Sequence, residues 1–181
     1  HYGKYPVNWL TGMISGVYTG YCTDEKIRRN SSSGGVLTAV LCSLLESEKI
    51  DAAIVVTQGI PEPEKASVVM VGSTAEIQAA SQSVYVPVST LHILNKLEPG
   101  KRYAITCLPE QAAAIRVLQM HGHEKALCIR YILGPYTGTA IYPAAIEMFK
   151  RINGISNTDR VVSLKWRAGE WPGYLEIITQ S

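Results

Sequence analysis

The clearest structural signal in this chain is the stretch from residue 31 to residue 57, SSSGGVLTAVLCSLLESEKIDAAIVVT. Its middle places apolar side chains at the three- and four-residue spacing of one helical face, which predicts a helix over 36–45. The run from Asp51 to Thr57 is short, apolar and partly β-branched without alternation, as in a strand covered on both faces. A helix followed by a buried strand indicates an α/β fold.

The same succession of helices and strands continues along the rest of the chain. Residues 59–65 contain two prolines and are predicted to form a turn, and 83–88 is extended in character. Because parallel neighbours need crossover connections, we expect a mixed or mostly parallel sheet flanked by helices. The further strands are predicted at 66–71, 103–106, 126–133, 161–164 and 174–178, and the further helices at 74–80, 90–97, 110–121 and 143–152.

The composition is that of an ordinary globular protein. The 181 residues are 46% hydrophobic and 18% charged, with 17 Lys and Arg against 15 Asp and Glu. A net charge of +2 with scattered basic residues argues against a general nucleic-acid surface. The apolar runs are shorter than the ~20 residues of a membrane span. We expect a single domain over 1–181, or a fragment of a longer chain, since the first residue is His1 and no signal peptide is evident.

The cysteines and histidines do not form a metal-binding pattern. No Cys-x-x-Cys pair occurs, so we expect buried, reduced thiols in a cytoplasmic protein. His121 and His123 lie near each other, but no nearby carboxylate or thiol completes a ligand set. The four cysteines stand singly at Cys22, Cys42, Cys107 and Cys128.

The serine- and glycine-rich turn Ser31-Ser-Ser-Gly-Gly35 directly precedes the strongest helix. Its hydroxyls and unpaired backbone amides would gather at the positive end of that helix dipole, where a phosphate can bind. The alternative is that Ser33 caps the helix and the glycines permit a tight entry.

Two further turns follow predicted strands. Residues 107–111, Cys-Leu-Pro-Glu-Gln, open a helix at the carboxyl edge of the sheet, where ligands commonly bind, although a Pro-Glu helix start is often plain structure. Residues 134–138, Gly-Pro-Tyr-Thr-Gly, could let the backbone approach a flat ring or a phosphate, or could form a simple turn.

Aromatic and basic residues cluster near the end of the chain. Trp166, Arg167, Trp171 and Gly173 could form a stacking or anion-binding surface, or the tryptophans could close the core. A Gly-x-Ser-x-Gly elbow, a Gly-x-Gly-x-x-Gly motif and a Walker phosphate loop are all absent from the sequence. The residues by themselves therefore indicate an α/β domain with a candidate phosphate site.

Residues 21–36, YCTDEKIRRNSSSGGV, resemble the opening signature of the coenzyme F420 hydrogenase/dehydrogenase beta-subunit family. The resemblance spans almost the whole chain in consistent order. It continues through the leucine-rich helix and Ile-Asp-Ala strand of 44–56, the Ser-x-Tyr-x-Pro of 83–87, the Leu-Pro-Glu-Gln of 108–111, the Leu-Gly-Pro-Tyr-Thr-Gly of 133–138, and Arg167 with Trp171-Pro-Gly173.

Members of that family are flavoproteins that bind FAD, carry iron–sulfur clusters and pass electrons between reduced deazaflavin coenzyme F420, or related donors, and a partner enzyme or small substrate. The resemblance therefore implies a redox activity with a redox partner subunit or a small-molecule donor. It implies that the cofactor phosphates would meet Ser32, Ser33, Gly34 and Gly35. It also implies that the flavin pocket would be lined by the backbone of Leu108, Pro109, Glu110, Gln111, Gly134, Thr137 and Gly138.

The departures from the family concern the cluster. Glu110 and Thr137 stand where the family usually has cysteines. Cluster iron is held chiefly by cysteine sulfur, so we expect no iron–sulfur cluster within this chain. The family's amino-terminal ferredoxin-like segment is also absent from the sequence.

Three hypotheses about function follow. The first is a flavin-dependent oxidoreductase domain that transfers hydride at FAD between a reduced deazaflavin-type donor and an acceptor, without its own cluster. The second is a non-catalytic assembly or regulatory module that keeps the fold, in which oligomers are conceivable. The third is a domain that binds another nucleotide or anionic metabolite through the same turn.

Overall fold

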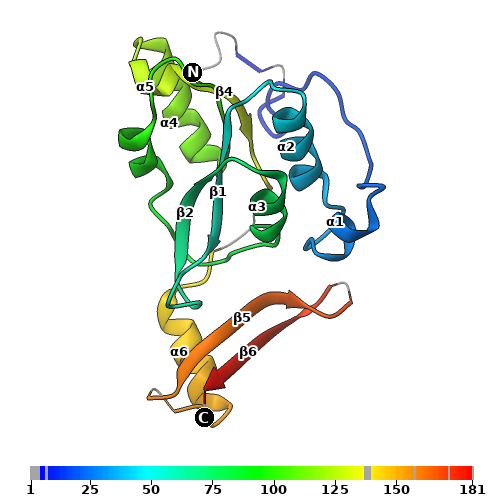
Figure 1. Ribbon diagram of the computed structural model, residues 1–181, viewed down its shortest axis with the longest axis vertical. Coiled ribbons are helices and arrows are strands. Elements are labelled where there is room, and N and C mark those ends of the chain that lie inside the picture. The colour runs from blue at the N-terminus through cyan, green and yellow to red at the C-terminus, as the bar shows by residue number, and fades with distance from the viewer. Residues whose placement is uncertain (1–4, 7, 137–139, 157, 171, 181) are drawn as a thin grey trace.

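The computed structural model describes residues 5–6, 8–136, 140–156, 158–170 and 172–180. At its centre lies a four-stranded sheet in the order β2, β1, β3, β4 (Figure 1). β1, β3 and β4 are parallel, and β2 pairs with β1 in the antiparallel sense. The predicted mixed, mostly parallel sheet is therefore confirmed. The strands are β1 (Ala52–Gln58), β2 (Ala66–Val71), β3 (Tyr103–Thr106) and β4 (Ile129–Leu133).

Both faces of this sheet are covered by helices (Figure 1). In β1, Ile54 packs into the core on one face, and Ala53 and Val55 pack into the core on the other. This alternation within an uninterrupted apolar run is what a strand buried on both sides requires. The first face is covered by the 3₁₀ helix η1 (Thr90–Lys96), α4 (Pro109–Met120) and α5 (Glu124–Leu127), and the second by α2 (Val36–Glu46) and α3 (Thr74–Ala79).

A second unit of secondary structure lies at the end of the sheet where β1 turns into β2 (Figure 1). It consists of α6 (Pro143–Ile152) and the antiparallel hairpin of β5 (Arg160–Ala168) and β6 (Tyr174–Gln180). Ile146, Leu164 and Trp166 form the centre of its own apolar cluster. The Gln58 side-chain amide donates to the Leu164 carbonyl and so joins β1 to the hairpin.

The chain that precedes α1 runs beside α2 and leads into the short helix α1 (Glu25–Arg29) (Figure 1). The helix α1 was not predicted from the sequence. Its start is fixed by the Asp24 carboxylate, which accepts from the amides of Lys26 and Ile27 at 2.8 and 3.2 Å. Among the described residues, no helix has the length and apolar character that crossing a membrane would need.

Several predicted boundaries are wrong. The strand expected over 126–133 starts only at Ile129, because the His123 ring caps the helical turn of α5 by accepting from the Ala126 amide at 3.3 Å. The segment 165–168 was expected to be loop but belongs to β5, where Lys165 pairs with Glu176. The helix expected over 90–97 is the 3₁₀ helix Thr90–Lys96. The segment 83–88, expected to be extended, belongs to no named strand.

Candidate functional site

The residue at the N-cap of helix α2 is Gly35, not a serine. Gly35 has φ of 73°, and no described side chain caps the first turn. The alternative in which Ser33 caps this helix is therefore wrong. The first amides of an α-helix have no partner within the helix and form the positive end of its dipole. They remain available to an anion here.

The turn before α2 is held in place by the residues that surround α1. The Cys22 amide donates to the Gly34 carbonyl at 2.7 Å, and the Ser31 hydroxyl donates to the Ile27 carbonyl at 2.7 Å. A Cβ atom at Gly34 would lie 3.2 Å from the carbonyl oxygen of Gly20. The lack of a side chain at Gly34 thus serves the close approach of the chain that precedes α1.

A cavity of about 700 Å³, here called the larger cavity, opens beside this turn. This volume lies in the range of roughly 300 to 1,000 Å³ that is usual for small-molecule sites. One wall consists of α1 residues and residues 31–34, and the opposite wall of Arg167, Glu170 and Gly173. The structure therefore brings the predicted Ser32, Ser33 and Gly34 together with the end of β5 and the loop after it.

Arg167 is the basic side chain that the hairpin contributes to the larger cavity. One of its terminal nitrogens, Nη1, donates to the Tyr85 hydroxyl at 3.1 Å. Its Nε is buried and has no hydrogen-bond partner among the described residues. Arg167 also lines the larger cavity, where a phosphate can accept from the guanidinium nitrogens that face it.

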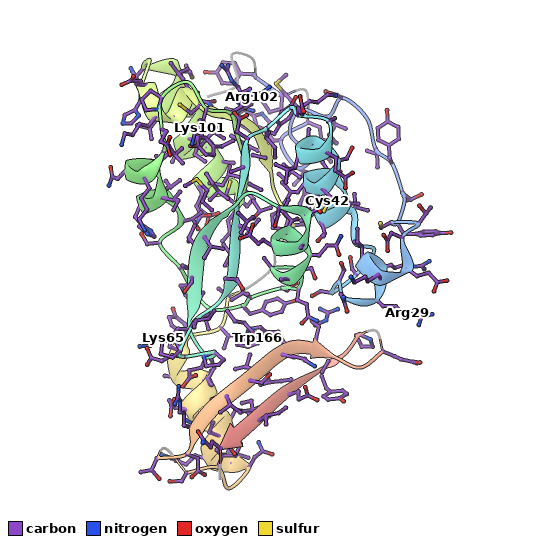
Figure 2. All side chains as sticks on the ribbon, viewed as in Figure 1. Arg29, Cys42, Lys65, Lys101, Arg102 and Trp166 are labelled. Atoms are coloured by element: carbon purple, nitrogen blue, oxygen red, sulfur yellow. The ribbon has the colours of Figure 1, made fainter. Side chains whose placement is uncertain are left out.

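The α1 side of the larger cavity carries two more arginines. The Arg28 guanidinium lies 4.0 Å above the centre of the Tyr21 ring, and Arg28 lines the larger cavity. Arg29 lies on the outer side of α1 (Figure 2), and its Nη2 is 2.9 Å from the Glu25 Oε2. With Glu25 and Glu170 as the acidic lining residues, the cavity holds one more positive than negative side chain.

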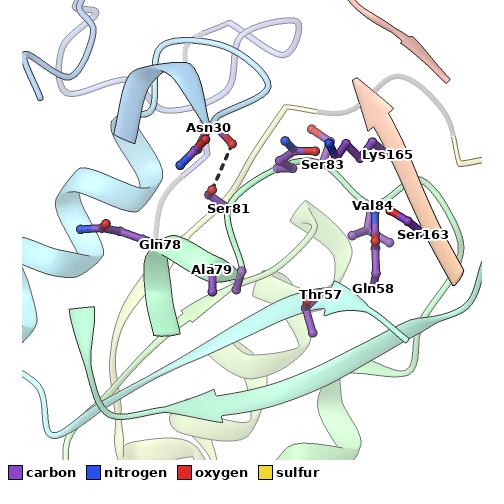
Figure 3. Close-up of a pocket in the computed structure, with 12 residues that line it drawn as sticks. Asn30, Thr57, Gln58, Gln78, Ala79, Ser81, Ser83, Val84, Ser163 and Lys165 are labelled. Carbon is purple, nitrogen blue, oxygen red and sulfur yellow. Dashed lines mark hydrogen bonds between the residues drawn. The ribbon is translucent and has the colours of Figure 1, made fainter. Parts of the chain in front are cut away.

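A second cavity of about 290 Å³, here called the smaller cavity, adjoins the first. The amide of Ser83, which lines the smaller cavity, donates to the hydroxyl of Ser32, which lines the larger, at 2.8 Å. Within the lining of the smaller cavity, the Ser81 hydroxyl donates to the Asn30 carbonyl at 3.0 Å. Figure 3 shows Lys165 extending from β5 toward Ser83 in this cavity.

The other predicted site residues lie along the carboxyl edge of the sheet. Leu108 precedes α4 and Pro109 is its first residue, and the Gln111 side chain accepts from the Leu108 amide at 3.0 Å. Gly134 follows β4, next to the end of β3. Neither 108–111 nor Gly134 is among the described residues that line the two cavities. Thr137 and Gly138 lie outside the described residues.

Of the two tryptophans singled out from the sequence, the structure describes Trp166. Trp166 is 6% exposed and packs against Tyr85 with ring centres 5.6 Å apart, so it closes the core. Trp171 lies outside the described residues. Gly173 lines the larger cavity.

The thiols and imidazoles form no metal site among the residues that the structure describes, where no group of three or more His, Cys, Asp or Glu is suitable. The four cysteines are free. Cys42, Cys107 and Cys128 are buried as predicted, whereas Cys22 is half-buried. Burial, followed by the charge of Glu110, raises the pKa of the Cys107 thiol to about 11. This thiol therefore stays protonated at neutral pH.

Arg167 was predicted from the sequence, but the other basic residues of the two cavities, Arg28, Arg29 and Lys165, were not. Arg28 and Arg29 are separated from the serine run only by Asn30. Lys165 was assigned to a loop. Its place on a strand, at alternate positions with Ser163 and Arg167, could have been found by extending the period-two pattern of β5.

Comparison with known proteins places these features in a family. Residues 17–95 match the amino-terminal model of the coenzyme F420 hydrogenase/dehydrogenase beta subunit, and residues 100–181 match the carboxyl-terminal model. The fold is similar to that of a chain in the F420-reducing [NiFe] hydrogenase complex from Methanosarcina barkeri, with a TM-score of 0.70 and 18% identity. That similarity covers 92% of this chain and 64% of the other. No curated protein sequence gives a match.

Proposed function

This chain belongs to the coenzyme F420 hydrogenase/dehydrogenase beta-subunit family, and from that membership we propose that it is a flavin-dependent oxidoreductase domain that binds FAD in the larger cavity. One observation carries the proposal: the serine-glycine turn 31–34, which leads into α2, faces Arg167 across this cavity. The hydroxyls and backbone amides of such a turn, together with an arginine, can form a site for a pyrophosphate.

The residues present fit the diphosphate part of FAD. The Ser33 side chain is exposed to the larger cavity and can donate a hydroxyl to a phosphate oxygen. Arg167 is already oriented by its bond to Tyr85 and lines the larger cavity. Arg28 with Tyr21 presents a flat surface on which a base could stack.

When bound, FAD would supply a two-electron carrier for hydride from a reduced deazaflavin-type donor such as coenzyme F420. The chain's own residues would bind and orient the cofactor. The backbone of 108–111 and 134–138 is proposed to line the pocket for the ring, since 108–111 and Gly134 lie on the same sheet edge as Thr57 and Gln58 of the smaller cavity. Glu110 is a poor ligand for cluster iron, so onward electron transfer would need a redox partner subunit or small acceptor.

Two other functions remain as outcomes of the test. The excess of arginine over glutamate in the larger cavity also suits a nucleotide or another anionic metabolite. A non-catalytic assembly module would keep the fold but bind neither. The flavin-dependent oxidoreductase would bind FAD. The nucleotide-binding domain would bind ADP without FAD, and the assembly module would bind neither ligand.

The experiment is a titration of the purified protein with FAD and separately with ADP, comparing wild type with Arg167→Leu. Loss of a hydrogen-bonded charge contact costs about 1.5 to 3 kcal/mol, so we expect affinity for both ligands to fall by roughly 10- to 100-fold.

Arg160→Leu is the matched control, because Arg160 lies on the same strand and does not line either cavity. We expect its FAD affinity to equal that of the wild type. Equal affinities in all three proteins would contradict the proposed site. Binding of ADP without FAD would favour the nucleotide-binding domain, and binding of neither would favour the assembly module.

A further inference from the structure

Residues 8–21, here called the arm, run beside α2 and carry exposed apolar side chains (Figure 1). A turn at the start of the arm is closed by the Gly12 amide, which donates to the Asn8 carbonyl at 2.8 Å. The three apolar clusters of the described residues include no residue of the arm. The apolar side chains of the arm that are more than half exposed are Trp9, Leu10, Met13, Ile14, Val17, Tyr18 and Tyr21.

The helix α2 is apolar on its exposed side as well as on its buried side. Its buried side packs against β1 and α3 through Leu41 and Cys42. A helix that is apolar all round is normally covered all round. The part that the described residues leave open, here called the outer face of α2, consists of Val36, Leu37 and Val40, which are between 37% and 46% exposed.

The arm and the outer face of α2 together are large enough for a stable protein interface. A tyrosine or tryptophan side chain offers roughly 150 to 250 Å², so these residues together expose on the order of 1,000 Å². The largest apolar patch on a typical monomer covers about 300 to 600 Å². An interface of standard size takes about 800 Å² from each partner.

The charge pattern of this surface indicates which partner fits it. The sequence has no Asp, Glu, Lys, Arg or His within 8–21 or within 36–45. Charged groups steer and select an unlike partner, whereas two copies of an uncharged surface bring no like charges together. Charged residues border the surface instead, in α1 before the start of α2 and in 46–49 at its end, as in the polar rim of an interface.

We infer that the arm and the outer face of α2 form the interface of a homodimer, in which this surface of one copy covers the same surface of the other. Interfaces between identical subunits are more apolar than other interfaces, and aromatic residues and methionine are enriched at interface centres. Trp9, Met13 and Tyr18 fit that composition. Neither the arm nor the outer face of α2 is among the described residues that line the two cavities, so dimer formation and FAD binding can be measured separately.

The test is sedimentation velocity of the purified protein over a range of micromolar concentrations, comparing wild type with Val17→Lys on the arm and Val40→Lys on α2. We expect the wild type to have twice the mass of the chain. In a two-fold symmetric contact each replacement places a charge in the interface from both copies. We therefore expect the dissociation constant of the dimer to rise by roughly 100-fold or more in each variant.

Ile152→Lys is the matched control. Ile152 is a β-branched residue nearly as exposed as Val17, 75% against 80%, and it lies on α6, away from α2 and the arm (Figure 1). We expect its dissociation constant to stay within about twofold of wild type. Far-ultraviolet circular dichroism checks that each variant folds, and Val17 lies outside the named helices and strands, so its replacement removes none of them.

Each outcome decides the inference. A dimer in wild type and Ile152→Lys that dissociates in folded Val17→Lys or Val40→Lys supports the interface. A wild type that is monomeric at every concentration overturns it, as does a dimer that persists in both folded variants or that Ile152→Lys weakens equally. A monomer that binds phosphatidylcholine vesicles would assign the surface to a lipid membrane instead. A monomeric wild type that retains FAD would overturn the homodimer and leave the proposed function standing.

Discussion

Among single residues, Gly35 determines whether the amides at the start of α2 stay open. Its left-handed backbone starts the helix without a capping side chain. A Cβ atom at this position would lie 3.2 Å from both Ile27 Cγ2 and Ser31 Oγ. The glycine thus provides both the backbone angle and the space that the turn needs.

We predict that Gly35→Ala lowers both stability and FAD affinity. The left-handed angle costs an L-residue about 1 to 2 kcal/mol, and displacement of Ile27 and Ser31 adds to this and moves the turn that lines the larger cavity. The measurements are urea unfolding and FAD titration.

Gly122→Ala is the control for Gly35→Ala. Gly122 has nearly the same φ, 72° against 73°, but a Cβ atom there would meet nothing within 4 Å. We expect a smaller loss of stability and no change in FAD affinity. Equal effects of the two replacements on FAD affinity would count against the placement of the site.

At the scale of secondary structure, α3 supports the wall of the smaller cavity. Its first turn is closed by a reciprocal pair of bonds, in which the Glu76 amide donates to the Ser73 hydroxyl at 3.3 Å and the Ser73 amide donates to the Glu76 carboxylate at 3.0 Å. The chain that leaves α3 carries Ser81 and Ser83, which line the smaller cavity. The capping bonds therefore fix an element on which the site depends.

We predict that Ser73→Ala lowers the free energy of unfolding by about 1 kcal/mol, the usual cost of losing a serine cap. Ser89→Ala is a matched control, because Ser89 precedes η1 without a capping bond from its side chain. Its effect should stay within about 0.5 kcal/mol. Urea unfolding measures both, and an equal loss from the two replacements would show that the α3 cap contributes nothing.

Most helices and strands could be predicted from the sequence because their apolar residues recur at clear helical or strand spacing. The strands at 66–71 and 103–106 have the predicted bounds, and the helix at 36–45 differs by one residue. Boundaries failed where tertiary contacts override the local pattern. The His123 cap turned 124–127 into a helix, and pairing with β6 extended β5 to Ala168.

At the scale of the whole molecule, the site depends on segments that are distant in sequence. The serine-glycine turn was found from the sequence because its signal is local. Arg167 faces it across the larger cavity only because Gln58 and the cluster around Trp166 hold the hairpin at the end of the sheet. Local patterns do not contain that packing, so the sequence could not show that the two cavities adjoin.

The central sheet is also linked by a charged pair between β1 and β3. Asp51, just before β1, accepts from the Arg102 guanidinium at 2.7 Å and from the Arg102 backbone amide at 2.7 Å. These bonds from Arg102, the side-chain bond first, lower the pKa of Asp51 from 3.8 to about 2. Both side chains of the pair are exposed, so water screens their attraction and reduces what the pair contributes to the free energy of unfolding.

We predict that Asp51→Asn is less stable than wild type at pH 6 and that this difference shrinks at lower pH. The pKa of Asp51 in the folded protein lies below its ordinary value. The contribution of the Asp51–Arg102 pair to the free energy of unfolding is therefore complete above about pH 4 and is lost as the pH falls toward 2. Urea unfolding at pH 6, 4 and 3 measures the difference.

Arg102→Gln provides the check on this assignment. It removes the same interaction, so the double variant should lose less stability than the sum of the two single variants. A difference between Asp51→Asn and wild type that is the same at every pH would contradict the role given to this pair.

The most direct test of the central claim is the visible absorption spectrum of the purified protein after incubation with FAD and removal of unbound cofactor. The serine-glycine turn before α2 and the Arg167 guanidinium predict that the protein retains FAD at a ratio near one per chain, with the absorption bands of a bound flavin. A protein that stays colourless at every FAD concentration would contradict the claim that the larger cavity is a flavin site.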